Sequence, residues 1–249
     1  MSKKIAEGAK HLVIDLKIGS GAFMPDLARA RELARLLVST GASFGQKVRV
    51  VFSNMNSPLG LAVGNALETV EAIEYLKGNP LRDTKILTSE LTAQLLLSAG
   101  LAATGPDAFR MIEDAVASGQ ALTKLEEIIT AQGGDPRVLE DYSLLGTTSV
   151  KIPILAEAAG WVKAIDCRAI GYALVRIKAG RMKVSDSLDY GAGALLIPKI
   201  GDKLERGEPI GEIHANHPAQ AEEVARLIRA AYTISPEPTN KEDLILDII

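Results

Sequence analysis

The stretch HLVIDLKIGSGAFM, residues 11–24, decides the fold of this chain. Residues 12–18 form an apolar run broken only by Asp15 and Lys17, a pattern typical of a parallel strand that is buried on both faces. After the glycines that end this strand, Asp26 is expected to cap a helix that runs to about Gly41. A second strand over 47–52 and a second helix over 65–76 complete a β-α-β-α unit, which favours a parallel sheet.

The rest of the chain divides into a helical part and a part rich in short strands. Before residue 150 the pattern predicts helices over 89–99, 106–117 and 121–131, a stop at Gly133-Gly134-Asp135-Pro136 and a short helix over 137–142. Beyond it we expect strands over 151–156, 160–165, 194–197 and 209–214, with helices over 168–178 and 219–232.

The stretch KIGDKLERGEPI, residues 199–210, resembles the turn-strand unit of the hammerhead barrels in biotinyl and lipoyl domains. The expected fold class is therefore α/β, with a mixed, mainly parallel sheet and flanking helices, followed by a C-terminal α+β hammerhead-like (barrel-sandwich) region. Met182-Lys183-Val184 is the nearest match to a cofactor-carrying lysine tip, but it lies in a loop rich in glycine and charge. A surface lysine is the favoured interpretation there.

Composition excludes several classes of partner. Of the 249 residues 47% are hydrophobic and 24% charged, and the net charge is −3 with scattered lysines and arginines, so nothing indicates binding to nucleic acid. No apolar run reaches membrane-spanning length, and no signal peptide is evident, so we expect no membrane partner. The one cysteine, Cys167, excludes an internal disulfide, which fits a cytoplasmic protein, and we expect it to be a small buried side chain.

Several segments together resemble one enzyme family. MSKKIAEGAKHLVIDLKIGSGAFM, SNMNSPLGLAVGNALETVEAIEYLKG, IGDKLERGEPIGEIHA and AAYTISPEP are similar, in the same order, to segments of the thymidine and pyrimidine-nucleoside phosphorylases. The resemblance implies reversible phosphorolysis of a pyrimidine nucleoside to free base and pentose 1-phosphate, with phosphate as co-substrate and no organic cofactor. It implies the domain limits 1–10, a remnant of the helical domain; 11–149, an α/β domain with a helical insertion; and 150–249, the C-terminal domain of the family.

The helical domain and the KHSTGG-type phosphate loop that open family members have no counterpart in this sequence. We therefore expect a C-terminal portion that is inactive alone, or active with an N-terminal half supplied separately; a homodimer is a further possibility. Gly19-Ser20-Gly21 is by itself only a weak match to a phosphate-binding loop, since it lacks the third glycine of a dinucleotide fingerprint.

The resemblance also implies site residues. The SKK match gives Lys3 a contact with the pyrimidine base, and the GAF match makes Phe23 an apolar wall of the base pocket. The carbonyls of Leu59 and Ala62 with the carboxylate of Glu71 match a monovalent-cation site, which implies a potassium ion. Without the resemblance, Lys3 would be a solvated terminal lysine, Phe23 a packed core residue and Glu71 a solvated helix residue.

Two other interpretations stay open. The chain could be a non-catalytic binding or scaffold module built on the hammerhead-like region, or an enzyme similar to AMP phosphorylase with its own base-recognition residues. Asp15 and Lys17 could form a functional pair at a cleft, although a structural ion pair or simple exposure is equally compatible with the pattern. The histidines, His11, His214 and His217, are too far apart in sequence to indicate a metal site.

Overall fold

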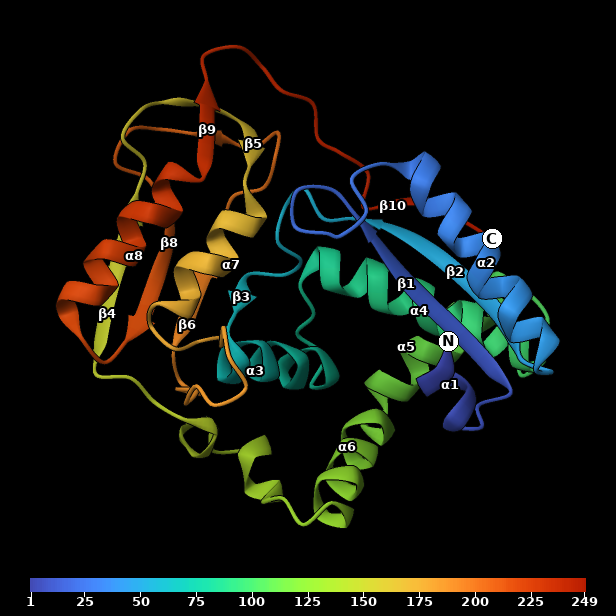
Figure 1. Cartoon of the computed structure of the whole chain (residues 1–249). Coiled ribbons are helices and arrows are strands. Elements are labelled where there is room, and N and C mark those ends of the chain that lie inside the picture. The colour runs from blue at the N-terminus through green and yellow to red at the C-terminus, as the bar shows by residue number, and fades with distance from the viewer.

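The first sheet is built around the opening strand. The computed structural model describes residues 1–249, and in it β1 (His11–Ile18) pairs in parallel with β2 (Lys47–Asn54), from His11 opposite Lys47 to Ile18 opposite Asn54. The third strand, β10 (Ile245–Ile248), returns from the far end of the chain and pairs antiparallel with β2 (Figure 1). The strand order is therefore β1-β2-β10, and β1 lies at an edge.

Helices cover both faces of this sheet. Helix α2 (Leu27–Ser43) begins at Asp26, whose carboxylate accepts a hydrogen bond from the backbone N–H of Arg29. Its small residues pack on the apolar side chains of one face, in a cluster made of Leu16, Ile18, Ala30, Ala34, Val50 and Phe52. Helix α4 (Arg82–Ala99) covers the other face, where His11 hydrogen-bonds Ser98 and Arg49 donates to Gln94.

Four helices follow one another along the middle of the chain. They are α3 (Asn65–Leu76), α4, α5 (Gly105–Ala117) and α6 (Gln120–Ala131). Thr104 caps α5 by accepting a hydrogen bond from the N–H of Asp107. Helix α4 begins at Arg82, seven residues before the expected start at Ser89. The short helix expected over 137–142 is wrong: two separate 3-10 turns, Pro136–Leu139 and Tyr142–Leu145, occupy this stretch.

The C-terminal part contains two antiparallel sheets. One has the order β3-β6-β8-β4, and the other β7-β5-β9. Their strands are β3 (Ala62–Val63), β4 (Val150–Leu155), β5 (Gly160–Ile165), β6 (Gly193–Leu196), β7 (Lys203–Leu204), β8 (Pro209–Ala215) and β9 (Tyr232–Ser235). Helices α7 (Cys167–Val175) and α8 (Pro218–Ala230) pack with them around the largest apolar core, which contains 22 buried residues.

The expected α/β class with mixed sheets is confirmed, but two finer expectations are not. The sheets are not mainly parallel, since β1 and β2 are the one parallel pair among the named strands. The C-terminal sheets do not close into a barrel, so the hammerhead-like description is not confirmed either. The division near residue 150 stays an interpretation of the sequence, and two strands cross it: β3 joins a C-terminal sheet and β10 joins the first sheet.

The two ends of β1 lead to different features. The short helix α1 (Ser2–Ala6) lies beside the start of β1, where the side chain of Gln46 donates to the carbonyls of Lys4 and Ala9 (Figure 1). The other end opens into the loop 19–26. No helix of the structure combines the length and the apolar character that crossing a membrane requires.

Candidate active site

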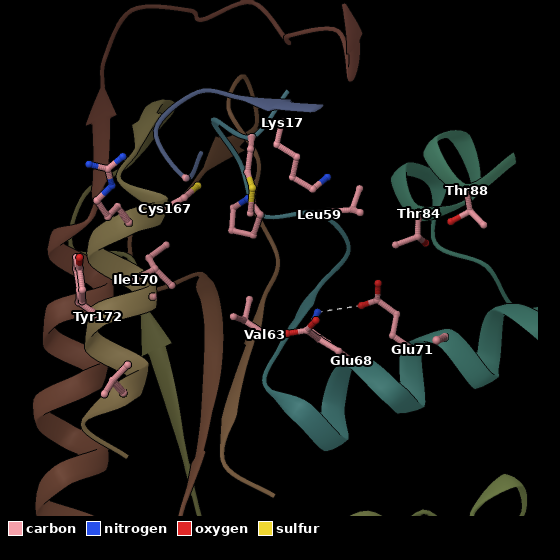
Figure 2. A pocket seen from close by; sticks show the side chains of 18 of the residues that line it. Lys17, Leu59, Val63, Glu68, Glu71, Thr84, Thr88, Cys167, Ile170 and Tyr172 are labelled. Atoms are coloured by element: carbon pink, nitrogen blue, oxygen red, sulfur yellow. Dashed lines mark hydrogen bonds between the residues drawn. The ribbon is translucent and has the colours of Figure 1, made fainter. Parts of the chain in front are cut away.

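The main cavity has a volume of about 830 Å³ and lies between the helices α3, α4 and α7 (Figure 2). Its walls are largely apolar, with Leu59 from the loop before β3, Val63 from β3 and Ile170 from α7. Polar groups stand at its margins: Lys17 at the end of β1, Glu68 and Glu71 on α3, and Arg168 on α7. Such a cavity, apolar with a few fixed polar groups, is typical of a site for a small organic ligand.

The Asp15 and Lys17 pair lies on the α4 side of the first sheet. Lys17 Nζ is 2.8 Å from Asp15 Oδ2, and the hydroxyl of the fully buried Ser53 donates to the other carboxylate oxygen. Lys17 also lines the main cavity. The pair is thus a hydrogen-bonded ion pair, and the same lysine borders the space in which a ligand would lie.

Glu71 holds the loop Pro58–Ala62 against α3. One carboxylate oxygen, Oε2, accepts hydrogen bonds of 2.9 Å from the N–H groups of both Leu61 and Ala62. Figure 2 shows the Glu71 side chain reaching from α3 toward this loop. Leu59, Ala62 and Glu71 therefore lie together at one wall of the cavity, and Glu71 is a loop anchor rather than a solvated helix residue.

A lysine from the C-terminal part forms hydrogen bonds with two carbonyls of the same loop. Lys199, between β6 and β7, donates from Nζ to the carbonyl oxygens of Pro58 and Gly60 and lies 3.2 Å from Asp83 Oδ2. The same Asp83 oxygen accepts a 2.8 Å hydrogen bond from the N–H of Gly60. The carbonyls that Lys199 contacts are those of Pro58 and Gly60, whereas the resemblance assigns the carbonyls of Leu59 and Ala62 to a potassium ion. The potassium site therefore stays a prediction.

Phe23 lies on the loop after β1 and is 99% exposed, so the alternative in which it packs into the core is wrong. The loop is held onto the end of β5 and the start of α7: the Ser20 hydroxyl donates to the carbonyl of Ile165, and Arg168 donates to the carbonyl of Ala22. Phe23 borders a second, more polar hollow of about 600 Å³ that it shares with Arg29 and Arg168. Because Arg168 also lines the main cavity, the two hollows meet at this residue.

The structure does not bring Lys3 to Phe23. Lys3 lies on α1 at the start of β1, and Phe23 follows the end of that strand, so the eight residues of β1, about 25 Å of extended chain, separate them. Lys3 is exposed and borders neither of the two hollows described above. The role in base binding that the resemblance gives to Lys3 therefore stays a prediction, and within this chain the two residues do not share a pocket.

Cys167 is the first residue of α7 and lines the main cavity. Burial raises the pKa of its thiol, an effect that the hydrogen bond with Ser20 and the charge of Lys199 oppose. A raised pKa keeps the thiol protonated at neutral pH, and a protonated thiol is a poor nucleophile. The structure therefore agrees with a packing role. No group of three or more His, Cys, Asp or Glu side chains is placed to hold a metal ion.

Sequence reasoning missed the residues whose partners are distant in sequence. Lys199 contacts Pro58 across 141 positions and Arg168 contacts Ala22 across 146. Neither lysine nor arginine stands in a motif that marks such a contact. Lysine, aspartate and glycine are so common in turns that their presence in the sequence does not identify any one of them as a contact residue.

Comparison with known proteins shows which proteins the chain resembles. Residues 161–235 match the family model of the pyrimidine nucleoside phosphorylase C-terminal domain. A thymidine phosphorylase of Burkholderia orbicola is 38% identical over 94% of this chain and 54% of its own length. The pyrimidine-nucleoside phosphorylases of Bacillus subtilis and Staphylococcus aureus are each 39% identical, over 91% and 94% of this chain and 52% and 54% of their own lengths.

The chain is therefore similar to the thymidine and pyrimidine-nucleoside phosphorylases along nearly all of its residues, and part of it matches the model of their C-terminal domain. It spans about half the length of the curated relatives it matches.

Proposed function

We propose that this chain takes part in the reversible phosphorolysis of a pyrimidine nucleoside, which yields free base and a pentose 1-phosphate. The observation that carries the proposal is the 38–39% identity to such phosphorylases over more than nine-tenths of the chain. The reaction needs no covalent intermediate with the protein. It needs phosphate and nucleoside held in line and the departing base stabilised, which positioning and electrostatics supply.

Phe23 and Arg168 are the side chains that we assign to the substrate. The exposed ring of Phe23 offers a flat apolar face to a planar base, and stacking of a base on an aromatic ring contributes about 1–3 kcal/mol. Arg168 is fixed by its hydrogen bond to the Ala22 carbonyl, so its charge stands close to that ring. A fixed guanidinium can stabilise negative charge on a departing base or on phosphate.

We propose that a second polypeptide segment completes the site. The relatives have about as much sequence again as the part matched by this chain, and β1 has a strand neighbour on one side only. The open edge of β1 is a place where a further strand could pair. This segment would contribute the phosphate contacts that the resemblance assigns to the other half of the family.

The experiment joins this chain with the half of the Bacillus subtilis relative that it does not match, produced as a separate polypeptide. Release of base from thymidine, uridine and AMP is then measured with phosphate present. We expect phosphorolysis of a pyrimidine nucleoside by the mixture and none by this chain alone. Failure of the mixture on every nucleoside, with binding of the two polypeptides confirmed, would overturn the proposed function. Cleavage of AMP alone would assign the chain to the AMP phosphorylase-like alternative.

Variants of the active mixture test the individual residues. Phe23→Ala should raise KM about tenfold, which corresponds to the lower part of the stacking range. Phe44→Ala is the matched control, since Phe44 is also exposed and lies after the far end of α2. Lys3→Met lowers kcat/KM if the completed enzyme brings α1 to the base. An unchanged kcat/KM would remove Lys3 from the site.

A further inference from the structure

The ion pair of Asp15 and Lys17 stands at the end of β1, beside the main cavity, and is completed by a buried hydroxyl. In the parallel register of β1 and β2, Lys17 lies opposite Ser53, whose side chain is fully buried. The Ser53 hydroxyl donates to Asp15 Oδ1, and Asp15 Oδ2 accepts a 2.8 Å hydrogen bond from Lys17 Nζ. Both carboxylate oxygens are therefore in use, and they fix the Lys17 ammonium from one side.

The ammonium of Lys17 keeps one donor for the cavity. Of its three N–H groups, one donates to Asp15 and a second to the oxygen of Ser53 at 3.4 Å. The third has no partner in the chain, and the side chain, which is 31% exposed, points into the cavity (Figure 2). A donor that is partly withdrawn from water gains free energy when an acceptor meets it. This end of the cavity therefore has an open place for an oxygen atom of a ligand.

The surroundings of this donor favour a neutral oxygen over an anionic one. Asp15 compensates the charge of Lys17, and its carboxylate would repel a phosphate placed on the same ammonium. Thr84 and Thr88, both on α4, line the cavity near Lys17 (Figure 2). The Thr84 hydroxyl donates to the carbonyl of Leu81, so its oxygen is left as an acceptor, and the Thr88 hydroxyl has no hydrogen bond within the chain. Such a mixture of donors and acceptors matches hydroxyl groups, which both donate and accept.

We propose that this end of the main cavity binds the pentose of the nucleoside and that Lys17 donates a hydrogen bond to one of its hydroxyl groups. The inference rests on the proposed function, because that function makes a pyrimidine nucleoside the ligand. Phe23, which we assign to the base, borders the second hollow, whereas Gly21 of the same loop lines the main cavity. Arg168 lines both hollows, so it stands where base and pentose join. The apolar wall at Leu59 contacts the carbon atoms of the sugar ring.

Deletion of single hydroxyl groups from the substrate tests this contact in the active mixture described above. The kcat/KM of the unchanged chain and of Lys17→Met is measured with uridine and with its 2′-deoxy, 3′-deoxy and 5′-deoxy analogues. We expect Lys17→Met to lower kcat/KM with uridine about tenfold, since a hydrogen bond from a charged donor is lost. With the analogue that lacks the contacted hydroxyl the variant should have little effect, because the contact is then absent from both proteins. An analogue that is not cleaved is compared by its inhibition constant against uridine.

Two results of this assay would overturn the inference. An equal loss with every nucleoside would show that Lys17 supports the fold and not the sugar, and an unchanged kcat/KM with uridine would show that it makes no contact. Lys47→Met is the matched control. Lys47 is an exposed lysine at the opposite end of the same sheet, paired with His11 in the strand register and outside the cavity. Its variant should keep the kcat/KM of the unchanged chain with every nucleoside.

Saturation-transfer NMR on this chain alone gives a readout that needs no activity. Uridine is the probe, since the cavity that should hold its pentose lies within this chain. We expect transfer from the protein to the pentose protons, and weaker transfer to them in Lys17→Met than to the base protons. No transfer to the pentose protons of uridine by the unchanged chain would overturn the inference.

The two experiments separate the failure of this inference from the failure of the proposed function. An inactive mixture together with transfer to the pentose protons that depends on Lys17 would count against the phosphorolysis and leave the pentose site standing. An active mixture in which Lys17→Met affects every nucleoside equally would do the reverse. If Lys17→Met does not fold, Thr88→Val takes its place in both experiments under the same criteria, because Thr88 is exposed and valine keeps its shape.

Discussion

The hydroxyl of Tyr142 donates a hydrogen bond to the carboxylate of Glu74, across 68 positions of sequence. The contact joins the second 3-10 turn to helix α3. Lys77, the residue directly after α3, lies 5.2 Å from the centre of the Tyr142 ring and donates to the carbonyl of Leu139. The end of helix α3 therefore contacts both 3-10 turns of the connection between α6 and β4.

Tyr142→Phe should lower the free energy of unfolding by about 1–2 kcal/mol, because a hydrogen bond to a charged group is lost while the ring stays. Urea unfolding measures this change. Tyr172→Phe is the control: Tyr172 is 59% exposed and makes no side-chain hydrogen bond, so its variant should unfold like the unchanged protein. Equal loss in both variants would show that the Glu74 contact contributes nothing.

The same contact predicts a dependence on pH. The hydrogen bond from Tyr142, followed by that from Asn79, lowers the pKa of Glu74 from its ordinary value of 4.5. A group with a lowered pKa stabilises the fold fully above its unfolded pKa and loses that contribution as the pH falls through the folded value. Tyr142→Phe should therefore differ most from the unchanged protein above pH 4.5 and converge with it in stronger acid.

His214 predicts a loss of stability at a higher pH. Burial, and then the charge of Lys151, lower its pKa below the ordinary 6.5, while the hydrogen bond with Glu212 opposes them. The unfolded chain binds the proton more readily than the folded protein, so stability is complete above pH 6.5 and falls as the pH drops below it. His214→Gln should make the melting temperature depend less on pH below about 6.5. His217→Gln, at an exposed position, is the control.

Gly60→Ala should be far more damaging than Gly45→Ala. Both glycines have a positive φ, +66° and +74°, which disfavours alanine by about 1–2 kcal/mol. An added Cβ at Gly60 would stand 1.8 Å from Glu71 Oε1, whereas one at Gly45 would have no neighbour within 4 Å. We expect Gly60→Ala to lose at least about 2 kcal/mol more in urea unfolding, since Glu71 must release the loop. Similar losses would show that the backbone conformation alone matters.

Phe23→Ala should leave the stability within about 0.5 kcal/mol of the unchanged protein, because the ring is 99% exposed. Phe52→Ala, which empties a fully buried position of the first sheet, should cost about 3–5 kcal/mol. Thermal or urea unfolding of the two variants gives the comparison. A large loss for Phe23→Ala would mean that the ring packs against the protein and is not free to meet a ligand.

Local patterns predicted the elements that carry their own signals. Helix α3 has the expected limits, since Gly64 precedes it and Gly78 closely follows it. Strand β5 also has the expected limits, since it starts at a glycine and ends just before Asp166. The four strands that were missed, β3, β7, β9 and β10, are two or four residues long. Strands so short gain their stability from their partners, so their own sequence has little periodicity to detect.

The sequence predicts a mainly parallel sheet, but the structure has one parallel strand pair. A β-α-β-α order gives parallel neighbours only where each strand joins the same sheet. After β2 the chain enters β3, which pairs antiparallel with β6 in another sheet. For the candidate site, Leu59, Ala62 and Glu71 lie together at one wall of the cavity, and the cation-binding role that the resemblance gives them stays a prediction. The resemblance could not predict Lys199, because the packing of the C-terminal part against this loop is a property of the folded chain.

The place of β10 has a consequence for biosynthesis. About 190 residues lie between the end of β2 and the start of β10, and a ribosome needs roughly 10–40 s to add them. During that interval β2 has no neighbour on the side that β10 later covers, and an open strand edge pairs readily with other chains. Nascent chains on neighbouring ribosomes are thus exposed to aggregation through this strand edge. A chaperone bound to the nascent chain would prevent it.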